Sequence, residues 1–199
     1  MPGLAEVIEG PVLGVAPRLL GSILSHTTND GTVAVRLTEV EAYAGHEDPG
    51  SHAFRGPTRR NDVMFGPSGH LYVYFTYGMH YCCNLVCGQP GQASAVLLRA
   101  GEVVEGLDLA RIRRGSARDR DLARGPARLC SALGIDLSHN GLDLRAGALT
   151  LRPRDQPHPA GQIGVGPRVG LRRAANHPWR FWLTDEPTVS AYRPAKKLT

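Results

Sequence analysis

The sequence predicts a single domain of the mixed α/β (α+β) class. Its 199 residues suggest one domain and are enough to bury a sizeable core. Apolar strand patterns at 70–87 and 94–99 follow one another closely and agree with neighbouring antiparallel strands. Glycine and proline (24 and 15 residues) make up near a fifth of the chain, against an average of about an eighth, so we expect many turns and modest helix.

The first third of the chain predicts one helix, one strand and one long loop. A short amphipathic helix is expected at 17–24, where leucine and isoleucine recur at helical spacing and Pro17 stands near the first turn. The turn sequence at 29–31 leads into a strand at 32–43. Residues 44–69 show no period and are predicted to form an ordered loop, a feature that is usually functional at this length.

The remaining elements are predicted from alternation, turn residues and helix signals. In chain order they are a strand at 70–77, a tight turn at 77–79, a return strand at 80–87, a strand at 94–99, a basic helix at 105–120, a helix from Gly125-Pro126 to Leu133 that Gly134 ends, short strands at 142–151 and 181–184, and a loosely held tail at 187–199 with Lys196 and Lys197 in solvent.

The strand at 32–43 carries acidic residues where its pattern predicts the interior. The odd positions from 33 to 37 are apolar, and the same face then carries Glu39 and Glu41. An inward carboxylate is unfavourable unless it is paired, hydrogen-bonded or protonated, and such groups cluster at catalytic sites. The alternative is a β-bulge near Thr38 that turns both glutamates to solvent, and the pattern alone leaves the two interpretations open.

The chain is basic, with 23 Lys and Arg against 18 Asp and Glu and a pI of about 9.3. This balance favours a polyanionic partner, nucleic acid first, although a basic surface can also serve only solubility. Seven arginines lie within 111–128 and are opposed only by Asp119 and Asp121. They form either a solvated surface or a surface that contacts phosphates.

Several classes of protein are not favoured. We find no signal-peptide pattern at the N-terminus and no apolar run long enough to span a bilayer, so we expect a cytoplasmic protein that has no membrane partner. The four cysteines, Cys82, Cys83, Cys87 and Cys130, do not suggest a disulfide framework, and reduced thiols fit best. No Cys-x-x-Cys pair accompanies the histidines, so we expect no metal site.

A series of short motifs identifies a family. In order they are Glu39-Val40-Glu41-Ala42-Tyr43, Ser51-His52, Met64-Phe65-Gly66-Pro67, Leu71-Tyr72-Val73-Tyr74, Tyr77-Gly78-Met79-His80, Asn84, Val96-Leu97-Leu98-Arg99 and Gly125-Pro126-Ala127-Arg128-Leu129-Cys130. At this order and spacing, over roughly residues 10–185, the chain resembles the alkyladenine (3-methyladenine) DNA glycosylase family. The resemblance implies a curved antiparallel sheet, flanking helices and a protruding, DNA-intercalating β-hairpin.

The resemblance implies a base-excision repair enzyme that flips alkylated or deaminated purines out of duplex DNA and hydrolyses the N-glycosidic bond with an activated water. It implies a monomer, nucleoid-associated if bacterial, that needs no cofactor and binds double-stranded DNA containing damaged purines. The only lysines are Lys196 and Lys197, so no amine is placed for Schiff-base chemistry, which predicts a monofunctional enzyme that leaves an abasic site. The alternative is a non-catalytic damaged-DNA-binding module, against which Glu41 and Arg99 both argue.

The resemblance also implies the catalytic groups. Glu41 matches the general base that deprotonates the attacking water. Arg99 and the main-chain carbonyl of Leu171 match groups that help hold this water. Glu39 shares the parity of Glu41, but only Glu41 directly precedes Ala-Tyr.

Further positions match groups that bind the flipped base and the DNA. Tyr43, His52 and Tyr74 match aromatic residues that sandwich the base, and Asn84 matches a residue that crowds the guanine 2-amino group. At the hairpin tip, Tyr77 matches a wedge that fills the gap in the DNA, with Met79 beside it. The segment from Leu171 to Pro178 is shorter than in many relatives, so the preference among 3-methyladenine, 7-methylguanine, hypoxanthine and ethenoadenine stays open.

Overall fold

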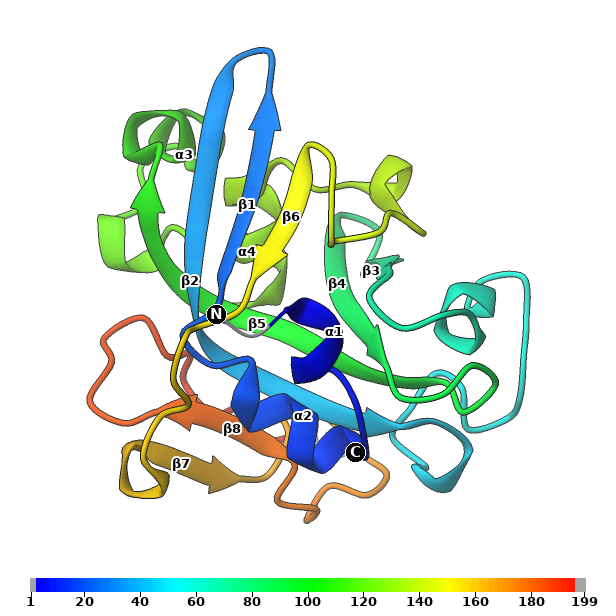
Figure 1. Cartoon of the computed structure of the whole chain (residues 1–199). Helices are drawn as coiled ribbons and strands as arrows, with labels where there is room; N and C mark the ends of the chain where they lie inside the picture. The colour runs from blue at the N-terminus through cyan, green and yellow to red at the C-terminus, as the bar shows by residue number, and fades with distance from the viewer. Residues whose placement is uncertain (1–2, 196–199) are drawn as a thin grey trace.

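One long strand, β2, organises an antiparallel sheet in this computed structural model, which describes residues 3–195 (Figure 1). The strand order is β3-β4-β5-β2-β1-β6, while β8 also pairs with β2 and β7 pairs with β8. The strands are β1 (Ile23–Thr28), β2 (Gly31–Ala44), β3 (Leu71–Thr76), β4 (His80–Cys87), β5 (Ser94–Glu105), β6 (Leu149–Arg152), β7 (Ile163–Gly166) and β8 (Arg180–Leu183).

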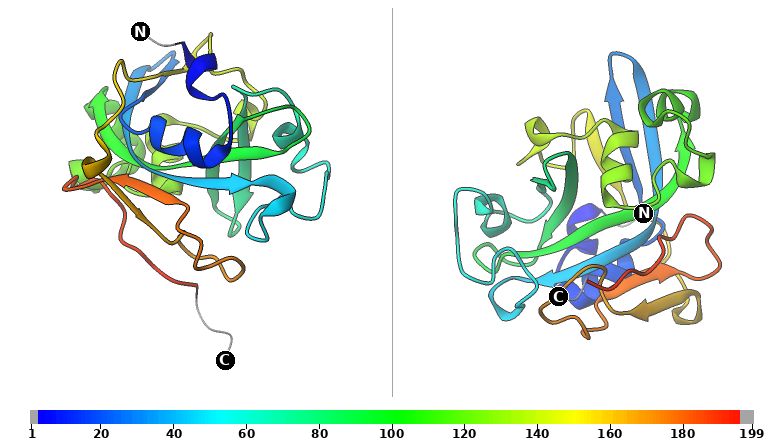
Figure 2. Two further views of the ribbon diagram at one scale, coloured as in Figure 1. Left: turned by 60° about the horizontal axis from the view of Figure 1, so that its bottom comes forward. Right: turned by 180° about the vertical axis from the view of Figure 1, so that it is seen from behind.

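Within residues 3–195, four α-helices flank this sheet. They are α1 (Leu4–Val7), α2 (Val12–Arg18), α3 (Leu107–Arg114) and α4 (Pro126–Leu133). Helices α1 and α2 lie in front of the sheet in Figure 1, whereas α4 lies on the opposite side, as the view from behind in Figure 2 shows. The prediction of a single mixed α/β domain with a curved antiparallel sheet and flanking helices is therefore confirmed.

A bulge divides β2 into two parts with different neighbours. Its first half pairs with β1 and β5, and residues 39–41 pair with β8 and β5. The register to β5 shifts between Leu37 and Val40, where Glu39 lies opposite Ala100. Core residues occupy odd positions before this shift and even positions after it, because one extra residue exchanges the two faces of a strand.

The hairpin of β3 and β4 follows the predicted boundaries closely. The two strands pair from Leu71 opposite Leu85 to Thr76 opposite His80. Its turn has positive φ at both central residues, 52° at Tyr77 and 67° at Gly78, as a type I′ turn requires. Entry of this hairpin into DNA stays a prediction.

Three predicted elements differ from the structure. The basic helix expected at 105–120 is shorter, because α3 spans only Leu107–Arg114 and Gly115 then adopts φ of 63°. The helix expected at 17–24 is wrong, because α2 ends at Arg18 and the chain then turns at Gly21, with φ of 81°, into β1. Leu19, Leu20 and Leu24 are buried, but in a turn and a strand, and Ile23 is only partly buried. Of the strand predicted at 142–151, only the end forms β6, since Gly147 adopts φ of 97° just before it.

The segment after β8 is tied to the sheet, in contrast to the loosely held tail expected from residue 187. Thr188 is buried, and its hydroxyl lies 2.9 Å from that of Thr38 on β2. The main-chain carbonyl of Arg193 accepts a hydrogen bond from Gly170. The predicted solvated Lys196 and Lys197 lie outside the described residues.

Strand β7 was not predicted from sequence, because its Ile-Gly-Val-Gly pattern gives a weak strand signal. The structure explains its glycines, since the Trp182 ring covers them. A Cβ atom at Gly164 would lie 2.3 Å from that ring. Among residues 3–195, no helix combines the length and apolar character needed to cross a membrane.

Candidate active site

A cavity of about 340 Å³ opens between the β3–β4 hairpin, β5, the loop after β2 and the segment 169–171. This volume falls within the range of small-molecule sites, roughly 300–1,000 Å³. The structure brings most of the predicted site residues to this cavity. Those that line it are Tyr43, His52, Tyr74, Tyr77, Asn84, Arg99 and Leu171.

Glu39 and Glu41 are both fully buried, although the bulge has turned them away from the apolar core. Both interpretations of the sequence pattern are thus partly right. A bulge is present at the predicted place, but the face to which it turns the carboxylates is covered by protein. Residues 168–171, 180 and 190 supply the cover, and they bring hydrogen-bond donors with them.

Glu39 is held by donors from three residues. Its carboxylate accepts hydrogen bonds from Arg99 Nε at 2.9 Å, Arg180 Nε at 2.7 Å, and both the main-chain N–H and the hydroxyl of Ser190 at 2.7 and 2.9 Å. Burial raises the pKa of Glu39, but the two guanidinium charges and Ser190 outweigh it, so the pKa lies below the usual value. Glu39 is therefore an ionised structural group.

Glu41 has a different environment, directly behind the cavity wall. Tyr43 donates its hydroxyl proton to Oε2 at 2.9 Å, and the main-chain N–H of Val169 donates to Oε1 at 2.7 Å. Arg99 Nη1 lies 3.3 Å from Oε1. All three neighbours line the cavity, and they hold the Glu41 carboxylate directly behind its wall.

Arg99 connects the two carboxylates. It is 6% exposed, and its Nη2 also lies 3.3 Å from the Ser190 hydroxyl. Burial lowers the pKa of Arg99, yet the adjacent Glu41 and Glu39 outweigh that effect and raise it. A permanently charged guanidinium thus stands at the border between the buried acids and the open cavity.

Aromatic rings form the other walls. The rings of His52 and Tyr74 meet edge to face, with centroids 4.6 Å apart, and Tyr72 stacks on Tyr74 at 5.6 Å. Burial raises the pKa of Tyr43 and Tyr74 well above 10, and burial followed by the charge of Arg60 lowers the pKa of His52. At neutral pH the cavity therefore presents uncharged aromatic faces.

Asn84 and the hairpin tip complete the predicted set. Asn84 is buried on β4, and its amide donates to the carbonyl of Tyr72 at 3.2 Å, which fixes its orientation. Tyr77 is 87% exposed in a left-handed conformation that non-glycine residues rarely adopt. Met79 is also exposed but does not reach the cavity; it lines a separate hollow beside α4.

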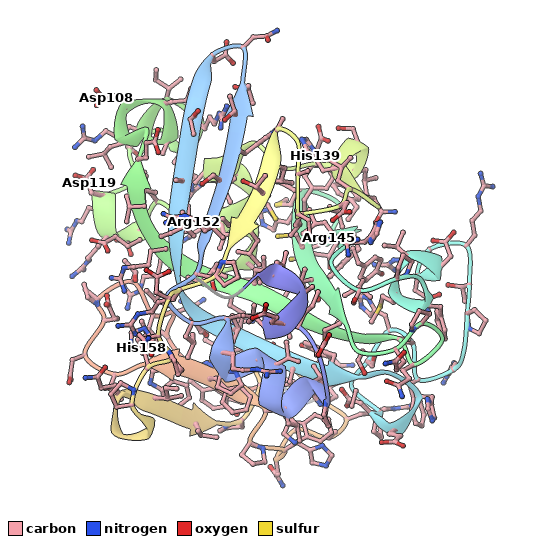
Figure 3. The ribbon with its side chains drawn as sticks, viewed as in Figure 1. Asp108, Asp119, His139, Arg145, Arg152 and His158 are labelled. Carbon is pink, nitrogen blue, oxygen red and sulfur yellow. The ribbon has the colours of Figure 1, made fainter. Side chains whose placement is uncertain are left out.

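The arginines at 111–128 differ in their contacts. Arg111 is hydrogen-bonded to both Asp108 and Asp119, which Figure 3 labels beside α3. Arg113 and Arg114 donate to main-chain carbonyls. Arg124 and Arg128 differ, because both line a cavity of about 320 Å³ that shares Arg99, Pro126 and Val169 with the first.

Sequence reasoning did not assign Tyr72, Asp48, Ser190 or a role for Arg168. Tyr72 lies two residues before Tyr74 in the strand pattern, so the sequence already indicates that both rings lie on the same face. The others come from loops without a period, and no local pattern links them to β2.

Comparisons with known proteins agree with the geometry. The sequence profile of the family described as "Methylpurine-DNA glycosylase (MPG)" matches residues 6–187. The chain is 58% identical over 197 residues to a "Putative 3-methyladenine DNA glycosylase" of Streptomyces avermitilis, covering 96% of this chain and 92% of that protein. Proteins with the same name from Leifsonia xyli subsp. xyli (56% identity, 91% and 88% coverage) and Frankia casuarinae (49% identity, 98% and 95% coverage) are also similar.

We predict that Glu39→Gln lowers the free energy of unfolding by about 3–5 kcal/mol, the usual effect of removing one charge from a buried ion pair. Because the folded-state pKa of Glu39 lies below its ordinary value of 4.5, its contribution is present above that pH and is lost as pH falls below it. Urea denaturation between pH 3 and 7 measures both effects. The half-exposed partner of Arg36, Glu102, provides the control, with Glu102→Gln changing stability by at most about 1 kcal/mol. A Glu39→Gln deficit that stays constant down to pH 3 would contradict this account.

Proposed function

This chain belongs to the methylpurine-DNA glycosylase family, and we propose that its aromatic cavity receives a damaged purine rotated out of duplex DNA. The protein is a DNA-binding hydrolase of base-excision repair, a monofunctional DNA glycosylase that acts on damaged DNA. We further propose that it acts as a monomer in the cytoplasm, on alkylated or deaminated purines.

One observation carries this proposal: Glu41 lies behind an aromatic cavity of purine size, with both carboxylate oxygens held by residues that line it. In the proposed reaction, a water oxygen attacks C1′ of the flipped nucleotide while the bond from C1′ to the base nitrogen breaks. The bonding electrons leave with the base, and the water gives its proton to Glu41. Arg99 and the main-chain carbonyl of Leu171 hold the water.

The charge of Glu41 has a second proposed effect. Cleavage develops positive charge on the sugar before the new bond is complete, and a fixed carboxylate nearby stabilises that charge. Arg99 offsets part of the negative charge, but it is also paired with Glu39.

Recognition of the base is assigned to the uncharged walls. Tyr43, His52 and Tyr74 offer π faces, and stacking on such faces contributes about 1–3 kcal/mol per base. Purines alkylated at N3 or N7 are cations and gain additional attraction to these faces. The fixed amide of Asn84 is assigned to exclude the 2-amino group of guanine, which depends on the orientation that Tyr72 gives it.

Tyr77 is the proposed wedge. Its exposure and positive φ hold the ring away from the body of the protein, where it can enter the stack that the flipped base leaves. Exposed Met79 stands next to it in the proposed DNA contact.

Glu41→Gln tests the proposed chemistry. The amide keeps the size of the side chain but cannot take a proton from water or offer negative charge to the sugar. We expect single-turnover base release to fall by at least about 10²–10⁴-fold, the range for loss of a general base. Lesion binding should remain, since the aromatic walls are unchanged.

The matched control is Glu39→Gln, measured at a temperature where circular dichroism shows it to be folded. It should release the base at a rate close to that of the wild type. Excision by Glu41→Gln within about threefold of the wild-type rate, far inside the general-base range, would make Glu41 structural and would overturn the proposal.

Tyr77→Ser tests the wedge. Without the ring, flipping from a well-stacked duplex becomes less favourable, so binding and excision should fall together. A lesion opposite a mismatch is already poorly stacked and should lose less. The measurement is the rate of excision by Tyr77→Ser on matched and mismatched duplexes. Equal losses of rate on both duplexes would show that Tyr77 does not drive flipping.

A further inference from the structure

A buried ion pair lies behind the cavity wall that Tyr43 forms. Arg168 is 1% exposed and Asp48 is fully buried. Arg168 donates from Nη1 to Asp48 Oδ2 at 2.5 Å and from Nη2 to Oδ1 at 2.8 Å, and Nη1 also donates to the carbonyl of Ala42 at 2.9 Å. This two-pronged geometry fixes the guanidinium plane.

The guanidinium lies against two aromatic rings. Its central carbon is 4.6 Å from the ring centre of Tyr43 and 4.9 Å from that of Trp179. Tyr43 lines the base cavity, whereas Arg168 is not among the residues that line it. The cation therefore covers the face of Tyr43 that points away from the cavity.

A cation against one face of a ring affects what the other face attracts. It draws π-electron density toward itself and repels a second positive charge across the ring. The reaction proposed above brings cationic purines, alkylated at N3 or N7, to the open face of Tyr43. A bare guanidinium behind the ring would oppose them, but Asp48 cancels its charge through two short hydrogen bonds.

We propose that the Arg168–Asp48 pair is a charge-compensated backing for Tyr43, and that Asp48 determines how well the cavity accepts cationic purines relative to neutral ones. This inference rests on the proposed function, because it needs a base stacked on Tyr43. It names two specificity-determining residues that act through another side chain and do not touch the substrate.

The alternative role of the Arg168–Asp48 pair is to brace the cavity walls. Asp48 also accepts a hydrogen bond from the main-chain N–H of Gly50 at 2.9 Å, and Arg168 precedes Val169, which holds Glu41. Loss of bracing would displace the cavity walls and weaken the binding of every base alike. Charge compensation predicts a selective effect, so a ratio of affinities separates the two roles.

The test uses two duplexes that differ only in lesion charge. One contains 3-methyladenine, a cation, on a 2′-fluoro sugar that resists cleavage, and the other contains neutral 3-methyl-3-deazaadenine on the same sugar. For each protein we would measure the ratio of the two affinities. In Asp48→Asn the guanidinium keeps its charge, so preference for the cation should fall by roughly thirtyfold, the effect of one unit charge about 8 Å away at an effective dielectric constant of about 20.

The double variant Asp48→Asn/Arg168→Gln should restore the wild-type ratio, because both charges are then absent. It also protects the test from misfolding, since replacing both members of a buried pair disturbs a protein less than removing one. If Asp48→Asn does not fold, the folded double variant must still match the wild-type ratio. Glu102→Gln, which breaks a half-exposed pair between Glu102 on β5 and Arg36 on β2, should leave the ratio unchanged.

Two outcomes would overturn the inference: equal weakening of both affinities in Asp48→Asn, or a ratio in the double variant as low as in Asp48→Asn. Failure of the proposed function is distinct from these results. In that case the wild-type protein itself would bind neither lesion duplex more tightly than an undamaged duplex.

Discussion

The site depends on a single guanidinium placed between two buried carboxylates. Arg99 on β5 lies 2.9 Å from Glu39 and 3.3 Å from Glu41, and both acids are fully buried on the adjacent strand. Two uncompensated charges in such a position would be prohibitively unfavourable. With Arg180 and Ser190 adding donors to Glu39, one acid is fully compensated, whereas Glu41 also depends on donors from the cavity wall. This asymmetry lets one strand carry a structural acid and a proposed catalytic acid two residues apart.

Distant parts of the chain converge on this short segment of β2. The bulge before Glu39 turns the acids out of the apolar core, β8 then pairs with residues 39–41, and the stretch from Thr188 to Arg193 covers what remains. The same stretch reaches the segment 168–171, which supplies the main-chain donor to Glu41 and one wall of the cavity. The contacts that stabilise this cover therefore also set the geometry of the site.

The sequence predicted those features that short-range patterns encode. Alternation indicated β2, β3 and β4, and the change from apolar to acidic residues within β2 located both the bulge and the buried acids. It could not decide where the acids point, because their cover lies more than a hundred residues away. Asp48, Arg168 and Ser190 were missed for that reason: each is a loop residue whose partner is set by tertiary packing. The apolar stretch after Pro17 was misread as helix because burial alone does not distinguish a turn and a strand from a helix.

The most direct test of this account asks whether Glu41, and not Glu39, presents negative charge to the reacting sugar. A duplex with a pyrrolidine in place of the sugar carries a cation where positive charge develops, and a tetrahydrofuran duplex is its neutral counterpart. We would measure the ratio of their affinities for the wild-type protein and for variants in which each glutamate is changed to glutamine. We expect a strong wild-type preference for pyrrolidine that disappears in Glu41→Gln and persists in Glu39→Gln. A preference that survives in Glu41→Gln, or disappears only in Glu39→Gln, would contradict it.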